Sequence, residues 1–584
     1  MQTSFSELEY TAKRRDSPVG DGRGWPTICI KRMLSMRVAQ QCFWQSCEGI
    51  EDAMLANREW KAFHRLAIIG ALVVMAGLLG GCTVGPNFTR PATPEVKSYI
   101  PENTTPNLSP GAGEPAQHFA INQEIPAAWW RLFQSPPLDN VVQQAIDGSL
   151  TIEAAKAKLA RAEQAVLQVQ GAYYPQIDAG ASAGRQRGPP IALGIRPSHD
   201  LPIFNLYSVG ATVSFAPDVF GLTTRLVEEQ KALAENQAYQ LAAAQLAVTG
   251  NAVNEALMIA SARLQIDAIN TIVADDEKTL ALVRQKFAAG KVSRTDTLTA
   301  EARLESDRAM LPPLRQQVAV AADALAILVG KSPAEWVSPA FDLTDFTLPA
   351  DLPVSIPSAL VRQRPDILAA EARLHAVSAA VGVADAQMYP NFTLSTSAGT
   401  AALSTSSLGN GSNLVWTLFG GLSAPIFNGG ALTAQKQGAI DEFHSTLALY
   451  RQTVLEGLGQ ITDLLRALDH DAELVQAQRR ALDASGAALD LQRLSYAAGK
   501  ADLPRLLDAE RNYQQANLGY IRAKTQRYLD SAQLFVAMGG GWWKDPSLCG
   551  DCRMRPVPTE KSAASSSNPA SGTSPTPYDR LMNR

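Results

Sequence analysis

The chain changes its hydrophobic period twice, from the 3.6 residues of a helix to the two residues of a strand. Each change follows directly after a proline, Pro175 in the first half of the chain and Pro390 in the second. One face of the alternating stretches is formed by Tyr207, Val209, Ala211, Val213 and Phe215, and later by Phe392, Leu394, Thr396 and Ala398. With further strands expected at 176–187 and 413–424, the pattern predicts one β-hairpin per half and four strands per chain.

These strands are apolar on one face and carry small polar residues on the other. That alternation over about ten residues is typical of a membrane β-barrel. The alternative is a soluble β-sandwich, but four strands among such long helices would be unusual for that fold. The expected hairpin tips, 188–205 and 402–412, are rich in Pro, Gly and Ser.

Four strands cannot close a barrel, because open edges would leave N–H and C=O groups without partners in lipid. Three chains would supply about 12 strands, a number within the known range of membrane barrels. The sequence therefore predicts that several copies share one barrel.

Each strand pair is followed by a long helical stretch with few helix-breaking residues, 223–289 and 433–498. At about 1.5 Å per residue, each would span roughly 100 Å, far more than a bilayer. Val273, Leu280 and Phe287 are spaced by sevens, as in the seam of a coiled coil.

Both long stretches end in the same sequence, Ala-Ala-Gly-Lys, with Gly290 in the first copy and Gly499 in the second. Glycine supplies a left-handed C-cap there. Ser293 with Asp296, and Asp502 with Pro504, are typical of helix starts. We expect return helices to about Leu328 and Met538, with Pro312-Pro313 bending the first.

The strand pairs are preceded by helical segments, Pro137 to Ala172 and Ser358 to Gln387, so the two halves follow the same order. The overall expectation is a mainly α-helical protein with membrane β-strands: a long antiparallel coiled-coil α-barrel plus four strands per chain. The repeats would be 129–345 and 346–543.

A targeting signal is expected at 54–81, where three basic residues precede an apolar run of 14 residues, 66–79. The run ends in Leu-Gly-Gly before Cys82, which resembles the lipobox of bacterial lipoproteins. The sequence thus predicts covalent diacylglycerol and N-acyl lipid on Cys82, and no other cofactor. A bare transmembrane anchor with a chance cysteine is the alternative. Residues 1–53 form a doubtful extension, and Met54 or Met36 is a possible start.

Composition and motifs exclude several classes of function. The net charge of −4 is too weak to indicate a nucleic-acid partner, and no P-loop, GxSxG or HExxH motif occurs. Cys549 and Cys552 have redox or metal spacing but no second pair, so a local disulfide, or nothing, is expected. The histidines form no ligand spacing. Residues 82–128 are expected to lead away from the lipid anchor, and 544–584 to form a disordered Ser/Pro-rich tail.

The order of lipobox, Trp-Trp opening, and two halves of helix, β-hairpin, long helix, glycine turn and return helix resembles the outer-membrane factor family, the TolC-like channels. It is most similar to their NodT-type lipoprotein branch. The resemblance covers about Trp129 to Trp543, and its local motifs include "APDVFG" at 216–221 and "LVRQRPDILAAEARL" at 360–374. It implies a homotrimer in the outer membrane whose helical tunnel docks on a periplasmic membrane-fusion adaptor protein, and through it on an inner-membrane pump of the resistance-nodulation-division type.

The resemblance also implies a gate at the second-half turn. Asp508 matches the family's aspartate ring, while Pro504-Arg505 departs from the family pattern one turn earlier. Arg505 and Arg511 lie three residues to either side of Asp508, within reach of it in the same chain or across protomers. An ordinary exposed Asp–Arg pair is the alternative. The expected adaptor-docking residues are Gly290, Lys291, Val292, Ser293, Gly499 and Lys500.

The sequence therefore predicts a passive gated duct that exports drugs or other small molecules, and no enzyme. A second hypothesis is the outer-membrane partner of a type I protein secretion or metal-efflux system. A third is a structural coiled-coil lipoprotein without a pore.

Overall fold

A computed structural model of the chain describes residues 83–93, 96, 98–100, 117–187 and 203–544. These residues belong to one compact unit, Gly81–Arg584. The expected signal segment 54–81, the extension 1–53, Cys82, and Cys549 with Cys552 lie outside the described residues.

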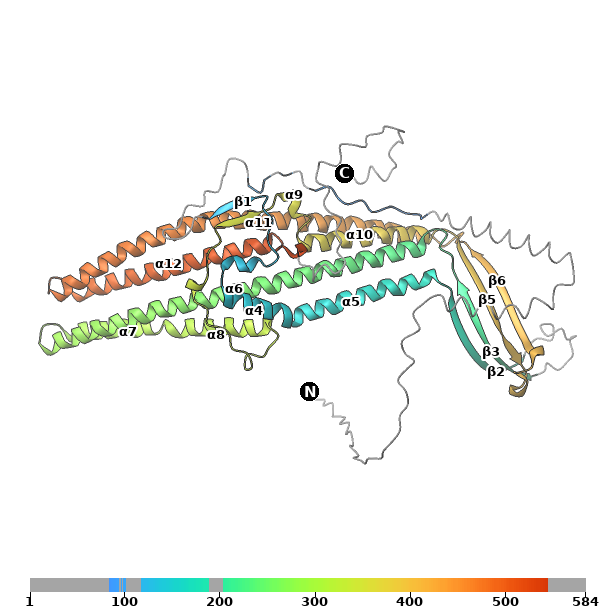
Figure 1. Cartoon of the computed structure of the whole chain (residues 1–584), viewed down its shortest axis with the longest axis horizontal. Helices are drawn as coiled ribbons and strands as arrows, with labels where there is room; N and C mark the ends of the chain where they lie inside the picture. The colour runs from blue at the N-terminus through green and yellow to red at the C-terminus, as the bar shows by residue number, and fades with distance from the viewer. Residues whose placement is uncertain (1–82, 94–95, 97, 101–116, 188–202, 545–584) are drawn as a thin grey trace, which may run out of the picture. The chain divides into compact units, whose positions relative to one another are not determined.

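Two helices of 67 residues each dominate the fold, α6 (Leu222–Ala288) and α11 (Ala431–Ala497) (Figure 1). Their bounds lie within two residues of the prediction. Both helices begin after a glycine in the left-handed region, Gly221 at φ +80° and Gly430 at φ +88°. The other α-helices are α4 (Pro136–Gly148), α5 (Leu150–Gln170), α7 (Arg294–Arg308), α8 (Leu311–Leu328), α9 (Pro357–Leu360), α10 (Pro365–Ala386) and α12 (Leu503–Ala537).

The predicted helical segment Pro137 to Ala172 is two helices, because Ser149 between α4 and α5 is extended. The end of α4 meets the end of α8 at two glycines there. A Cβ added to Gly148 would lie 2.3 Å from the Val329 carbonyl oxygen, and Gly330 has φ +76°. The first return helix is likewise divided into α7 and α8, at Ala309 and Met310, just before Pro312-Pro313.

The four predicted strands form one antiparallel sheet in the order β2-β3-β5-β6. They are β2 (Gln176–Arg187), β3 (Ile203–Phe215), β5 (Asn391–Ala402) and β6 (Leu414–Ser423). β3 begins at Ile203, so the expected loop 188–205 was too long. Residues 203–205 pair with the end of β2, and this pairing extends the hairpin.

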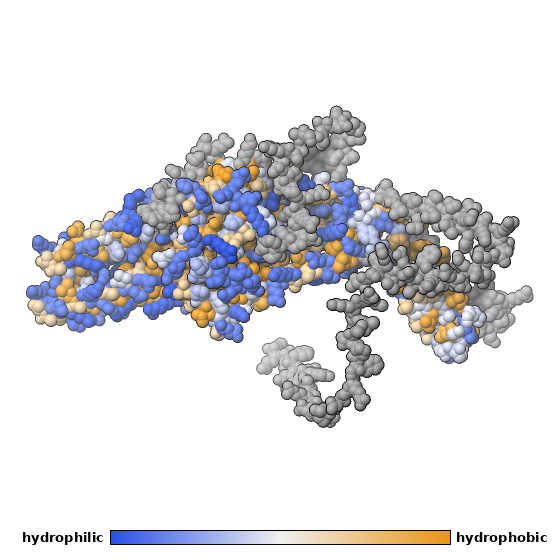
Figure 2. Space-filling view, in the orientation of Figure 1, coloured by the Kyte–Doolittle hydropathy of each residue, from blue (hydrophilic) through white to orange (hydrophobic). Residues whose placement is uncertain are grey.

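The register places the alternating residues of neighbouring strands on common faces. Ile177 is opposite Val213, Val213 is opposite Thr396, and Thr396 is opposite Leu418. The other face carries Asp178, Thr212, Ser397 and Thr417 in the same way. Large apolar side chains on the first face are exposed in the single chain, among them Ile177, Val209, Leu394, Trp416, Leu418 and Leu422. Figure 2 shows hydrophobic residues on the visible part of this sheet.

The strands of the two halves approach closely where Gly210 pairs with Gly399. A Cβ on Gly399 would lie 2.4 Å from the Val209 carbonyl oxygen. Glycines in neighbouring strands allow the bend that a curved sheet requires. Among the described residues, β2 and β6 each pair on one side only, so the sheet has two free edges.

A second, two-stranded sheet was missed by the sequence reasoning. β1 (His118–Ile121) pairs in parallel with β4 (Asp351–Val354), so the segment that precedes the first repeat pairs with the start of the second repeat. Each strand has only four residues, and the two are more than 200 residues apart, so no local pattern marks the pairing.

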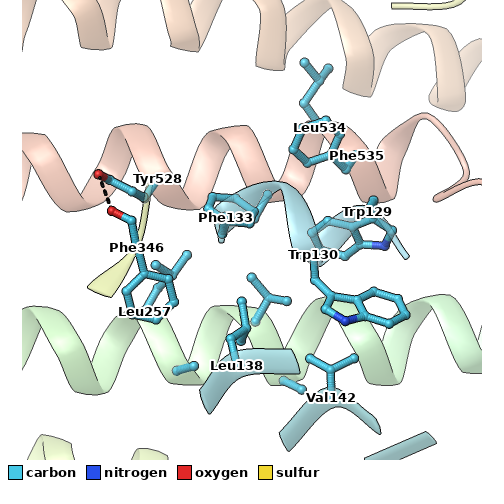
Figure 3. Close-up of a cluster of buried hydrophobic side chains, with 14 of the residues drawn as sticks. Trp129, Trp130, Phe133, Leu138, Val142, Leu257, Phe346, Tyr528, Leu534 and Phe535 are labelled. Atoms are coloured by element: carbon cyan, nitrogen blue, oxygen red, sulfur yellow. Dashed lines mark hydrogen bonds between the residues drawn. The ribbon is translucent and has the colours of Figure 1, made fainter. Parts of the chain in front are cut away.

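The Trp-Trp opening forms the centre of the largest apolar core (Figure 3). A short 3-10 helix, η1 (Trp129–Phe133), inserts its aromatic side chains between α6 and α12. Phe133 is fully buried and its ring lies 6.3 Å from those of Tyr528 and Phe535. The Tyr528 hydroxyl donates to the Phe346 carbonyl oxygen at 3.1 Å.

We expect Phe133→Ala to lower the free energy of unfolding by about 3–5 kcal/mol, because it removes a buried ring that the surrounding helices cannot replace. Denaturant unfolding followed by tryptophan fluorescence measures the loss. Ile121→Ala, at a side chain that is 74% exposed, is the control and should change stability little. Equal effects of both substitutions would show that this core does not stabilise the helices.

Candidate gate at the hairpin turns

The two glycine turns have the same backbone geometry. Gly290 has φ +67° and Gly499 has φ +72°. The N–H of Lys291 donates to the Lys286 carbonyl at 2.9 Å, and the N–H of Lys500 donates to the Ser495 carbonyl at 2.9 Å. Each turn is therefore a Schellman motif in which the left-handed residue is glycine.

The return helices begin as predicted, but with different caps. Ser293 and Asp296 form a reciprocal capping box at the start of α7. Asp502 caps α12 by accepting from the N–H of Arg505 at 3.3 Å, with Pro504 in the first turn.

Asp508 and Arg511 form an ion pair of 2.8 Å between exposed side chains. Arg505 points to its own cap instead and lies 3.5 Å from Asp502. Of the two pairings within the chain that the spacing allowed, only the one with Arg511 is formed. Asp508 thus remains exposed at the second hairpin. Of its two neighbouring arginines, Arg511 pairs with it and Arg505 does not.

The expected docking residues lie at the turns but are not equivalent. Gly290, Lys291, Ser293, Gly499 and Lys500 are exposed. Val292 is half-buried and packs on the apolar cluster that joins the two hairpins. The Val292 side chain therefore packs within the chain and is less accessible to a partner than the other five.

That cluster joins the two hairpins near their turns. Its buried members are Leu280, Val283, Ala300, Leu304, Leu489, Tyr496, Leu503 and Leu506, from all four helices. Burial, and secondarily the charge of Asp296, raises the pKa of the Tyr496 hydroxyl above its ordinary value.

Polar contacts add to the apolar cluster. The Lys286 ammonium donates to the Tyr496 carbonyl oxygen at 3.1 Å and lies 3.7 Å from the centre of the Tyr496 ring. Arg493 of α11 pairs with Asp275 of α6 at 2.8 Å. Burial would raise the pKa of Asp275, but hydrogen bonds from Lys278 and Arg493 outweigh it and keep that pKa below its usual range. Sequence reasoning missed these contacts, because their partners are more than 200 residues apart.

The segment Thr83–Arg90, which we call the strap, follows Cys82 and lies where β3 meets α6. The N–H of Val84 donates to the Phe220 carbonyl at 3.2 Å. Arg225, which is 3% exposed, donates from Nε to the Val84 carbonyl and from Nη2 to the side chain of Asn87. The strap is thus fixed to the folded helices directly beside the sheet.

The strap continues along α10. The Phe88 ring stacks on His375 at 4.5 Å, and Arg90 forms an ion pair with Glu371. Among the described residues, no group of three His, Cys, Asp or Glu side chains is placed to hold a metal ion.

A sheet with one apolar face, joined to helical hairpins of about 100 Å, defines a membrane channel of the TolC-like class. The model of the outer membrane efflux protein family matches residues 141–331 and 356–540, one range in each structural repeat. The chain belongs to this family, whose members are outer-membrane channels.

Individual proteins agree with this assignment. Outer membrane protein OprJ of Pseudomonas aeruginosa is 30% identical over 493 residues, which cover 82% of this chain and 97% of OprJ. Toluene efflux pump outer membrane protein TtgF of Pseudomonas putida is 28% identical over 484 residues, which cover 80% of this chain and 96% of TtgF. The solved structure of the outer-membrane channel OprN matches with a TM-score of 0.70 and 28% identity over 79% of this chain and all of that one.

The predicted class and location are therefore confirmed: the chain is the outer-membrane channel of a tripartite efflux system. The residues predicted for the gate, for adaptor docking and for lipidation stay predictions.

We expect Lys286→Met to loosen the second hairpin turn by about 1 kcal/mol, because it removes a cation–π contact and a hydrogen bond. Amide hydrogen exchange in the peptides around residues 490–505 should become a few-fold faster. Lys291→Met, at an exposed lysine of the first turn, is the control and should leave this exchange unchanged. Unaltered exchange in Lys286→Met would contradict the role given to this contact.

Proposed function

We propose that three copies of this chain form one passive duct. The observation that carries the proposal is the four-stranded sheet with an apolar face and two free edges, β2 and β6. In hydrocarbon each unpaired N–H or C=O costs several kcal/mol, so the edges need partners. Three sheets would supply about 12 strands and close the barrel.

The internal repeat indicates which edges meet. Within the chain, β3 of the first half pairs with β5 of the second, in antiparallel fashion. The equivalent strands at the free edges are β6 and β2. Pairing β6 of one protomer with β2 of the next would repeat the same contact around a three-fold axis.

The helices support the same assembly. α10 is buried between α6 and α11, whereas its counterpart α5 packs on α6 and has Ile152 as its one buried residue. α5 exposes Leu150 and Leu167, and α11 exposes Leu449, Leu455, Leu491 and Leu494. We infer that the α11 of a neighbouring protomer covers α5, as this chain's own α6 covers α10, because α6 and α11 are the equivalent helices of the two repeats.

The duct would be closed at the second hairpin and opened by its partners. Three copies of Asp508 around a narrow axis would favour cations and repel one another. The exposed turn residues Gly290, Lys291, Ser293, Gly499 and Lys500 would dock a periplasmic adaptor, which connects the duct to an inner-membrane pump of the resistance-nodulation-division type.

The cargo we propose is drugs or other small molecules. The relative TtgF is named for toluene efflux, which favours a small organic cargo over the protein cargo of a type I secretion system. Metal efflux stays the second candidate. A coiled-coil lipoprotein without a pore is not favoured, because the family consists of channels.

We also propose that Cys82 carries diacylglycerol and N-acyl lipid. The strap supports this, because Thr83 lies against Gly221, where the sheet ends and α6 begins. A Cβ on Gly221 would lie 2.8 Å from the Thr83 Cα. Acyl chains on the preceding residue would therefore start near the end of the sheet, and each buried CH₂ would add about 0.8 kcal/mol to anchoring.

Purified full-length protein in planar bilayers tests the duct. We expect cation-selective conductance, with a permeability ratio of K⁺ to Cl⁻ that falls toward unity in Asp508→Asn, because three carboxylates leave the constriction. Asp323→Asn, at an exposed aspartate of α8, is the matched control and should keep the selectivity. A protomer-sized band on an unheated gel after mild cross-linking, together with no conductance from any variant, would refute the proposal.

The lipid is tested by Cys82→Ser. We expect loss of metabolic palmitate labelling and accumulation of the unprocessed chain, because the acylated thiol is missing. Labelling that persists in Cys82→Ser would place the lipid elsewhere. The control is Cys549→Ser, which should label normally.

A further inference from the structure

Three carboxyl groups from three helices meet inside the protein near the turns. They belong to Asp276 of α6, Asp307 of α7 and Glu510 of α12, which are 3%, 1% and 3% exposed. Asp276 lies 14 residues before Gly290, or roughly 20 Å along the helix. Carboxylates are almost never buried to this degree unless they are paired.

The available partners do not satisfy all three groups. Gln514 donates to Asp307 Oδ1 at 2.9 Å, and Thr279 donates to Glu510 Oε1 at 3.3 Å. Asp276 Oδ2 and Glu510 Oε2 are buried without a hydrogen-bond partner, and Asp307 Oδ2 lies 3.0 Å from the Arg303 Nε in an ion pair. Asp276 and Asp307 lie within hydrogen-bonding reach of each other. Two ionised carboxylates only accept, so this contact requires a proton on one of them.

The charges around Asp276 do not compensate for three anions. From α7 it faces Asp307 and Arg303, and from α12 it faces Glu510. Arg303 is 3.0 Å from Asp307. Arg493 of α11 lies 3.9 Å from Glu510 but pairs more closely with Asp275 of α6.

A second buried carboxyl pair lies in the other hairpin. Asp471 of α11 and Asp530 of α12 are 8% and 7% exposed and lie within hydrogen-bonding reach of each other. Asp471 Oδ2 is also buried without a partner. The charged group that faces this pair is Arg527 of α12, whose Nε donates to Gln117 at 2.8 Å. Each hairpin therefore has one pair of aspartates across its two arms.

We propose that a single shared proton joins the two arms of each hairpin, between Asp276 and Asp307 in the first and between Asp471 and Asp530 in the second. Loss of these protons loosens the hairpins as pH rises. Through Glu510, the first pair also weakens the packing of α12 against α6. The consequence for opening of the duct rests on the proposed function, whereas the shared protons do not.

The pKa values support this geometry. Burial, then the hydrogen bond and charge of Asp307, and then the charge of Glu510, raise the pKa of Asp276 to about 8. Burial, then Asp530, raises the pKa of Asp471 to about 8. Burial raises the pKa of Glu510. Since the folded protein binds these protons more tightly than the unfolded chain, their contribution to stability is present at low pH. It is lost as pH rises from about 4 to about 8.

Hydrogen exchange of the full-length protein, compared at about pH 6 and about pH 9 after correction for intrinsic rates, tests the proposal. In the wild type we expect opening of both hairpins to increase about tenfold or more. Asp276→Asn should abolish the increase in α6 and α7 and leave it in α11, because an amide donates to Asp307 as the protonated acid does but does not titrate. Asp471→Asn should abolish the increase in α11 and leave it in α6 and α7, and each variant should reduce it in α12.

Asp307→Asn provides a second variant of the first pair, and Asp323→Asn on the exposed face of α8 is the matched control. Infrared spectra at neutral pH should show the carbonyl band of protonated carboxyl groups, reduced in Asp276→Asn and in Asp471→Asn. Absence of this band in the wild type, or the same pH response in wild type and both pair variants, would overturn the proposal.

Conductance distinguishes the shared protons from their effect on opening of the duct. We expect the open probability of the wild type to rise with pH and that of the double variant Asp276→Asn, Asp471→Asn to stay low. If exchange responds to pH as expected but open probability does not, the link from the proton to the gate is refuted. If no variant conducts at any pH, the duct function fails while the exchange result still decides the shared protons.

Discussion

Backbone hydrogen bonding in the absence of water is the constraint on which the rest of this molecule depends. A sheet in hydrocarbon has no solvent to satisfy its edges, so it must close on itself. A chain with four strands can meet this requirement only by association. The helices also favour association. Each pair of strands continues directly into helices that expose leucines, and a neighbouring chain that pairs with the strands would cover these leucines as well.

Duplication of one supersecondary unit places equivalent helices and turns in different surroundings within the chain. α5 and α10 are equivalent by their place in the repeat, yet α10 is a core helix and α5 lies at an edge. The two turns are also equivalent in backbone geometry but differ in their caps and charges. The second has the Asp508–Arg511 pair, and the first has a capping box. Equivalent backbone positions thus differ in charge and in side-chain contacts.

Periodicity and turn residues were sufficient to predict the long helices to within two residues, the four strands and both glycine turns. These features depend on local sequence, so local reasoning finds them. The β1–β4 pairing, the contact of Lys286 with Tyr496 and the buried aspartates could not be predicted in this way. Each joins residues that are brought together only when distant helices pack. Asp276 and Asp471 look like ordinary helical aspartates in the sequence, and only their burial distinguishes them.

With the proposed lipid on Cys82, the strap would set the depth of the protein in the membrane as well as attach it. Thr83 is held beside the junction of β3 and α6 by contacts that begin one residue after Cys82. Consecutive Cα atoms are about 3.8 Å apart, so a lipid on Cys82 would be joined to the chain one residue from this fixed point. Such a lipid would therefore fix the height of the sheet relative to the membrane surface in which it is embedded.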